Sequence, residues 1–178
     1  KKIAKKTFGL ELEKRVIDYW KSKLEIFPHL NNFNIKVDTI TLFHVLEHLT
    51  DPIKTLKEIK KKLKKGSVVI IEVPNSDDAL ITLYKNKKFK DFTFWSKHTF
   101  LYNVKTLDLI AKKSGLKKIK IEQLQRYPLS NHLYWLSEGL PGGHKILTNF
   151  NRKNLINEYN NELLKLGKCD TIIGLFKL

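Results

Sequence analysis

The fold is decided by residues 37–75, which read VDTITLFHVLEHLTDPIKTLKEIKKKLKKGSVVIIEVPN. The beginning of this stretch and the run 67–73 are rich in β-branched and apolar residues, which is typical of buried parallel strands. Between them, Asp51 and Pro52 predict a helix start, with the aspartate as N-cap and the proline at the first helical position. Apolar residues then recur at helical spacing until Gly66, where we expect the helix to end. Strand, helix and strand in alternation predict an α/β fold.

The same alternation continues on both sides of this stretch. The further elements that we expect are helices at 13–23, 104–114 and 151–166, and strands at 7–10, 24–27, 116–124 and 171–176. We therefore predict a single α/β domain over residues 1–178, built as a three-layer sandwich with a mostly parallel sheet.

Two segments, 86–102 and 127–150, do not fit the alternation. Both are rich in aromatic residues, histidine and asparagine, and both follow an expected strand. Ligands of open α/β sheets bind beyond the carboxyl ends of the strands. We therefore expect both segments to be irregular and to form the walls of a substrate pocket.

The composition restricts the class of protein. The 178 residues include 34 Lys and Arg against 18 Asp and Glu, a formal charge of +16, but only three of the 34 are arginines. Because nucleic-acid readers rely heavily on the planar arginine fork, we expect these lysines to form mainly solvated surface. No apolar run approaches the roughly 20 residues that span a bilayer, and the basic start has no apolar stretch behind it. A single cysteine excludes internal disulfides, so we expect a cytoplasmic domain with no membrane partner.

The chain contains no methionine and begins at Lys1. Because a natural chain starts with methionine and trimming favours small second residues, we expect this chain to begin inside a longer protein.

Several motifs resemble the class I S-adenosylmethionine-dependent methyltransferases of the small-molecule type. These are VLEHL followed by DP, LKKG and VVIIEVPN, which match the family's strand four, the helix after it and strand five. The sequence FGLE at 8–11 resembles the end of strand two, and 169–178 would be the antiparallel last strand. The resemblance implies a Rossmann-like fold and methyl transfer from S-adenosylmethionine.

The sequence departs from the family at its amino end. The family's glycine-rich cofactor loop should lie about twenty residues before Glu11, but the chain starts only ten residues before it. Strand one and its glycine turn are therefore expected to be missing. The given chain would be either a piece of an enzyme, inactive by itself, or a degenerate relative.

The resemblance also implies cofactor-binding residues. Glu11 would accept hydrogen bonds from the two ribose hydroxyls, which a carboxylate matches well. Phe43 and His44 would border the methionine part of the cofactor. The alternatives are an ordinary carboxylate at a helix start for Glu11 and strand-end packing for the other two.

The run His44-Val45-Leu46-Glu47-His48 also matches the zinc-peptidase pattern His-x-x-Glu-His. That use needs a long helix through the motif, whereas Asp51 and Pro52 predict a turn soon after it. Some quinone-pathway methyltransferases hold a metal here with Glu-x-x-Glu-His, in which His44 would replace the first carboxylate. We assign no metal ligand and leave metal-assisted transfer and peptidase activity open.

Methyl transfer to oxygen or nitrogen requires positioning and removal of a proton, and histidine suits that removal near neutral pH. The candidate catalytic residues are His98, His132 and His144, all in the two irregular segments. The candidate substrate-binding residues are Trp95, Tyr102, Asn131 and Tyr134. Each histidine could instead be structural, and the aromatic residues could be core.

The resulting hypothesis is methyl transfer from S-adenosylmethionine to an oxygen or nitrogen of a small molecule, such as an anionic or sugar-linked metabolite. One alternative is a non-catalytic binding or scaffold protein with the methyltransferase fold. A nucleic-acid methyltransferase or binder is the third hypothesis, and its binding would fall steeply with salt. A homodimer is left open.

Overall fold

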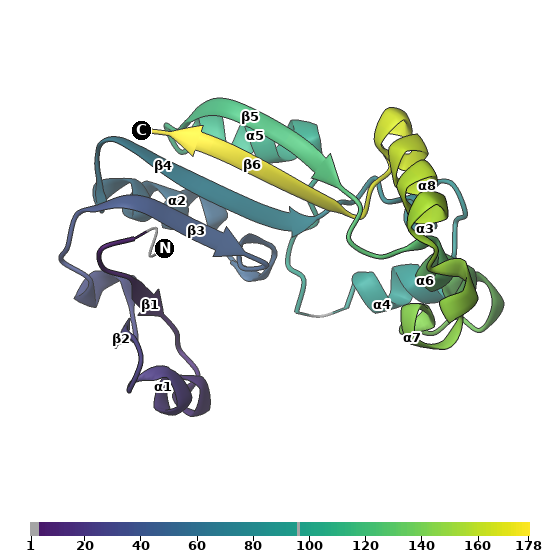
Figure 1. The fold of residues 1–178 in the computed structure, drawn as a ribbon. Helices are drawn as coiled ribbons and strands as arrows, with labels where there is room; N and C mark the ends of the chain where they lie inside the picture. The colour runs from purple at the N-terminus through teal and green to yellow at the C-terminus, as the bar shows by residue number, and fades with distance from the viewer. Residues whose placement is uncertain (1–3, 96) are drawn as a thin grey trace.

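The computed structural model describes residues 4–95 and 97–178 (Figure 1). A four-stranded sheet has the order β3-β4-β6-β5. Its strands are β3 Val37–Phe43, β4 Leu63–Pro74, β5 Lys117–Leu124 and β6 Thr171–Lys177. The β3 strand is parallel to β4, and β6 is antiparallel to both β4 and β5, so three strands point the same way. The predicted α/β fold with an antiparallel last strand is confirmed.

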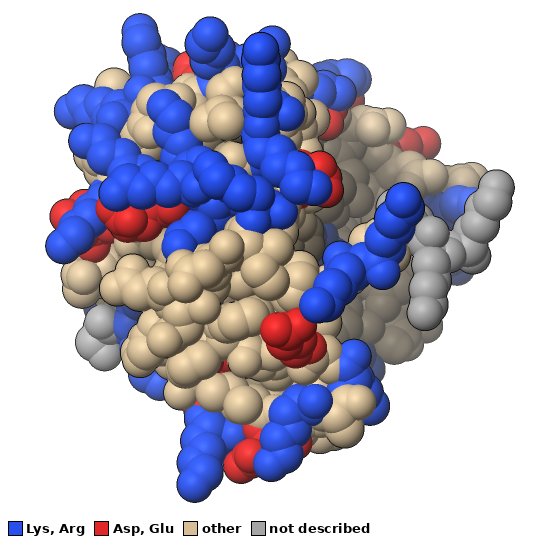
Figure 2. All heavy atoms as spheres, turned by 90° about the vertical axis from the view of Figure 1, so that its left-hand side faces the viewer, with Lys and Arg blue, Asp and Glu red and all other residues tan. Residues whose placement is uncertain are grey.

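Two helices, α2 Pro52–Lys61 and α5 Val104–Lys113, lie behind this sheet in Figure 1. They form a helical layer on this face of the sheet. Figure 2 views the molecule from the side where β4 begins and β6 ends, and lysines crowd the upper half of that face.

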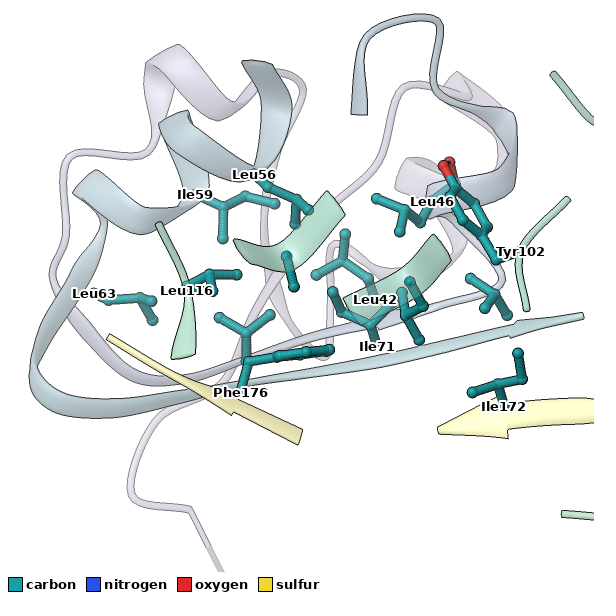
Figure 3. Packing of buried hydrophobic residues seen from close by; sticks show 14 residues of the cluster. Leu42, Leu46, Leu56, Ile59, Leu63, Ile71, Tyr102, Leu116, Ile172 and Phe176 are labelled. Carbon is teal, nitrogen blue, oxygen red and sulfur yellow. The ribbon is translucent and has the colours of Figure 1, made fainter. Parts of the chain in front are cut away.

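The core lies between the sheet and these two helices (Figure 3). Along β4, Val69, Ile71 and Val73 are buried, whereas the alternate residues are partly exposed. The register sets Leu42 beside Ile71. Full burial of such a side chain stabilises the fold by about 1.5–3 kcal/mol, so this alternation determines which face of the sheet carries helices.

The α2 helix begins as predicted and ends earlier. The Asp51 carboxylate accepts a hydrogen bond from Lys54 N at 2.9 Å, which confirms the cap. The helix ends at Lys61 rather than at Gly66, because Leu63 already pairs with Val37 and is buried in the core. Gly66 lies inside β4 at a positive φ of 82°, which glycine adopts without strain.

The other predicted elements are present with boundaries shifted by a few residues. They are β1 Phe8–Leu10, α1 Lys14–Trp20, β2 Glu25–Phe27 and α8 Lys153–Leu166. The structure also contains three short 3-10 turns that were not predicted: η1 Leu30–Asn32, η2 Leu46–His48 and η3 Thr148–Phe150. Gly167, at φ 68°, caps the end of α8.

The segments 86–102 and 127–150 are not irregular throughout, which corrects the prediction. They contain the helices α4 Lys87–Thr93, α6 Leu129–Ser137 and α7 Gly143–Ile146, and α3 Ala79–Thr82 precedes them. Helix α7 packs so closely on α6 that a Cβ atom at Gly143 would lie 2.3 Å from Ser130 O. With α3 and α8 these helices gather at the end of the sheet where β4 ends (Figure 1), and we name α3, α4, α6, α7 and α8 the helical cluster.

Strands β1 and β2 form a separate parallel pair. It is stabilised by edge-to-face contacts of Phe33 with Phe8 and with Phe27. Strand β1 is not hydrogen-bonded to β3 in the sheets that the described residues form. The break between the two sheets therefore lies between β1, which precedes Glu11, and β3, which precedes His44.

Candidate active site

The carboxyl ends of β3, β4 and β5 lie at the same edge of the sheet. This follows because β4 and β5 are both antiparallel to β6, and β3 is parallel to β4. Polar and aromatic residues gather there. Phe43 and His44 end β3, Glu72 lies late in β4, and Arg126 follows β5. This is the position where open α/β sheets bind ligands.

His44 is the centre of this group. Its backbone has a positive φ of 53°, which turns the chain sharply at the end of β3. Its Nδ1 lies 3.2 Å from Glu47 Oε1 and its Nε2 lies 3.1 Å from Glu72 Oε1. Arg126 Nη1 contacts the same Nε2 and lies 3.2 Å from Glu72 Oε1. The hydrogen bond to Glu47 raises the pKa of His44, against the opposing effects of burial and of Arg126.

Arg126 is positioned by the half-buried carboxylate of Asp170, directly before β6. Asp170 Oδ2 accepts hydrogen bonds from Arg126 N at 3.0 Å and from Tyr127 N at 2.9 Å. Burial raises the pKa of Asp170, although these bonds act in the other direction. Neither residue was singled out from the sequence. The available signal was that one of only three arginines directly follows a predicted strand.

Glu11 lies where the resemblance places it, directly after β1. Its Oε1 accepts hydrogen bonds from Leu12 N at 2.7 Å and Glu13 N at 2.8 Å, as a carboxylate at a helix start does. Its Oε2 has no hydrogen bond to another described residue. Because β1 and β3 belong to different sheets, the strand register does not place Glu11 beside Phe43, whose side chain is 54% exposed.

Two of the three candidate catalytic histidines contact residues that are close in sequence to His44 or Arg126. His98 is half-buried, with Nδ1 2.7 Å from Thr93 O and its ring 5.0 Å from that of His48. The ring of His144 lies 6.0 Å from the ring of Tyr127, the residue after Arg126. Its Nδ1 is buried and has no hydrogen-bond partner among the described residues.

His132 is placed differently from the prediction. It is 1% exposed, its Nδ1 lies 2.7 Å from Tyr159 Oη, and its Nε2 lies 3.1 Å from Gln125 Nε2. Burial lowers its pKa to about 4. A neutral imidazole with both nitrogens bonded inside the protein cannot reach an acceptor, so this residue is structural in the observed arrangement.

The candidate substrate-binding residues fall into two groups, two that are at least partly exposed and two that are buried. Trp95 is exposed beside His98, and Tyr134 is half-buried on α6. Tyr102 is instead 2% exposed within the core, with its hydroxyl 3.4 Å from Leu46 O. Asn131 is buried and accepts a hydrogen bond from Gly142 N, which joins α6 to the start of α7. The last two therefore stabilise the fold rather than line a pocket.

Among residues 4–95 and 97–178, no helix has the length and apolar character that crossing a membrane requires.

Similarity to known proteins extends over most of the chain. The chain is similar to a solved S-adenosylmethionine-dependent methyltransferase from Archaeoglobus fulgidus. The TM-score is 0.59 and the identity is 18%, and the match covers 96% of this chain and 75% of that one. A second such structure, from Thermotoga maritima, gives a TM-score of 0.61 and 17% identity over 96% and 72%. These likenesses confirm the fold.

Similarity to curated proteins covers shorter stretches. The chain is 58% identical over 43 residues to the tRNA U34 carboxymethyltransferase of Campylobacter fetus, which is 24% of this chain and 15% of that protein. It is 32% identical over 111 residues to an uncharacterized protein of Methanocaldococcus jannaschii, which is 62% and 52%. The chain thus spans about half or less of these relatives' lengths.

The family is shown by a model described as "Methyltransferase domain", which matches residues 4–121, well over half of the chain. The matched residues include Glu11, the β3–α2–β4 unit and His98, on which the sequence resemblance and the candidate site depend. The chain therefore belongs to the methyltransferase domain family, whose methyl donor is S-adenosylmethionine.

Proposed function

We propose that the protein containing this chain transfers a methyl group from S-adenosylmethionine to an oxygen or nitrogen of a small anionic acceptor. The observation that carries the proposal is the group of His44, Glu72 and Arg126 at the carboxyl edge of the sheet in a methyltransferase domain. The Arg126 side chain is 40% exposed, so its cation is available at this edge to an anionic group.

The chain's residues fit two parts of the donor, which supplies an electrophilic methyl group when bound. Glu11 keeps one carboxylate oxygen for ribose hydroxyls, and its other oxygen is held by two backbone amides. The exposed ring of Phe43 offers apolar surface beside His44. The glycine turn expected before Glu11 does not fall within the described residues.

The acceptor must lose a proton, and His98 and His144 are the residues proposed to take it or to orient the acceptor. His98 Nδ1 faces a carbonyl oxygen, so the neutral ring keeps its lone pair on Nε2. His144 lies beside Tyr127, next to the arginine that would hold the acceptor's anionic group. His132 is not part of the proposed site.

Titration of the full-length protein with S-adenosylhomocysteine in a calorimeter tests the proposal. Binding is expected, and Glu11→Ala should weaken it by about 10-fold or more, as expected for loss of a hydrogen-bonded charged partner. The matched control is Glu13→Ala, an exposed carboxylate two residues away that pairs with Arg15. Absence of binding by the full-length protein would contradict the proposal and favour the scaffold alternative.

A second candidate acceptor is RNA, because the relative from Campylobacter fetus is named a tRNA U34 carboxymethyltransferase. A shallow groove on the lysine-rich side is lined by Lys36, Lys57, Lys60, Lys61 and Lys113. It lies at the start of β4 and the end of β6, opposite the carboxyl edge that holds His44. A bound RNA would therefore have to extend around the domain to reach the proposed site.

The salt dependence of RNA binding distinguishes the two acceptors. An RNA substrate predicts an affinity that falls by about 0.7 log units per log unit of salt for each phosphate contacted. The triple variant Lys57→Ala, Lys60→Ala, Lys113→Ala should reduce that slope. Salt-independent activity on a small anionic acceptor, unchanged in the variant, would remove the RNA hypothesis.

A further inference from the structure

We propose that Glu47, His48 and His98 bind a divalent transition-metal ion of the Zn²⁺ type. A carboxylate oxygen of Glu47 and one ring nitrogen of each histidine lie within 4.8 Å of one another. The first two residues belong to η2, and His98 comes from the segment after α4, fifty positions later in the sequence. Two imidazole nitrogens and one carboxylate oxygen form a donor set that zinc and other borderline divalent metals prefer.

The two segments are joined by their own hydrogen bonds. Phe100 N donates to Glu47 O at 3.2 Å, and His48 Nδ1 lies 2.7 Å from Lys97 O. The three ligands are thus held together by the fold before any ion binds. Such preorganisation favours a specific site over a chance grouping of surface side chains.

The hydrogen-bond partners of both histidines show which ring nitrogen carries the proton. His48 Nδ1 faces Lys97 O and His98 Nδ1 faces Thr93 O, each at 2.7 Å. A carbonyl oxygen only accepts, so Nδ1 carries the proton in both rings and each neutral ring keeps its lone pair on Nε2. Histidines that ligate metals typically donate the other ring N–H to such a carbonyl, which orients the ring.

Glu47 supplies an independent observation that points to a ligand. Its side chain is completely buried, Oε1 is bonded to His44 Nδ1, and Oε2 has no hydrogen-bond partner in the described part of the chain. A buried carboxylate oxygen without a partner is unfavourable. A cation between Oε2 and the two histidines would satisfy it.

The proposed ligands differ from those that the motif suggested. In the peptidase pattern His44 and His48 would share one helical face, but η2 is three residues long and His44 lies outside it, bonded to Glu72. The peptidase arrangement is therefore not formed, and His98 supplies the second imidazole.

Three protein ligands leave a coordination position open for water or for an acceptor oxygen, which the ion would polarise. A metal here occupies the lone pair of His98, which would leave His144 as the proposed base. Metal binding at these residues does not depend on methyl transfer and can be tested separately from it.

The test is calorimetric titration of Zn²⁺ into the full-length protein after chelator treatment and desalting. One equivalent should bind, and His48→Gln and His98→Gln should each weaken binding by about 10-fold or more. His29→Gln, which changes an exposed histidine in the loop after β2, is the matched control and should bind as the unmodified protein does.

Cobalt(II) gives a second readout that needs no variant. The unmodified protein should show the visible absorption of a four- or five-coordinate Co²⁺ site, and Zn²⁺ should displace it. Absence of this absorption, or equal Zn²⁺ affinity in the unmodified protein and in a variant that carries both His48→Gln and His98→Gln, would overturn the proposal.

Discussion

Two histidines, each with both ring nitrogens bonded, show how the carboxyl edge of the sheet differs from the helical cluster. His44 lies partly exposed between the carboxylates of Glu47 and Glu72, and its pKa is raised. His132 lies inside the helical cluster between Gln125 and Tyr159, which are neutral, and burial lowers its pKa to about 4. The charge of the partners and access to water, not the residue type, separate a chemically usable histidine from a structural one.

The largest expected effect is on packing within the helical cluster. Trp135→Ala removes a side chain that is 3% exposed and packs against Phe89 and Phe92 at ring distances of 5.1 and 5.2 Å. The free energy of unfolding should fall by about 3–5 kcal/mol, measured by urea denaturation. A loss below about 1 kcal/mol would mean that this region is not a packed core. The control is Leu136→Ala, an exposed neighbour on the same helix.

His132 should make stability depend on pH. Its folded pKa of about 4 lies below the ordinary 6.5, so the unfolded chain binds the proton more tightly. The neutral ring therefore contributes its full share of the free energy of unfolding above pH 6.5. As the pH falls from 6.5 towards 4, the free energy of unfolding should decrease by up to about 3 kcal/mol.

Urea denaturation of the unmodified protein and of His132→Gln at pH 4.5 and pH 7 measures this contribution. The difference in unfolding free energy between the two proteins should change with pH in favour of the variant at pH 4.5. If the two proteins differ in unfolding free energy by the same amount at both pH values, the pKa of His132 is not lowered in the folded protein.

Arg126→Ala should affect activity and leave the fold intact. Loss of a charge-assisted contact to an anionic acceptor should lower kcat/KM by about 10- to 100-fold, because hydrogen bonds to charged groups contribute about 1.5–3 kcal/mol. Arg152→Ala, an exposed arginine before α8, is the control. Equal losses on neutral and anionic acceptors would show that Arg126 acts by positioning His44 rather than by binding the acceptor.

Phe43→Ala gives the smallest expected effect on stability. Its ring is 54% exposed at the end of β3, so the free energy of unfolding should change by no more than about 0.5 kcal/mol. If its surface contacts the donor, S-adenosylhomocysteine should bind the full-length variant about 5-fold more weakly in calorimetry, about 1 kcal/mol. An unchanged affinity would place the donor elsewhere.

Local chemistry in the sequence was enough to predict most of the fold. The β-branched runs and the Asp51-Pro52 helix start act over a few residues, and the structure contains the elements that they predict. The exceptions arise where a distant partner competes with a local signal. Leu63 pairs with Val37 and so ends α2 before Gly66, and packing among α6, α7 and α8 orders a stretch that the sequence predicts to be irregular.

The candidate site was decided mainly by tertiary structure. The sequence by itself determined the family motifs, the place of Glu11 after a strand and the group of polar residues at the end of β3. Only the folded chain brings Arg126 to His44, sets His98 beside Glu47 and buries His132 against Tyr159. Contacts between residues tens of positions apart depend on how helices and strands pack, and neither periodicity nor capping encodes that packing in a short window of sequence.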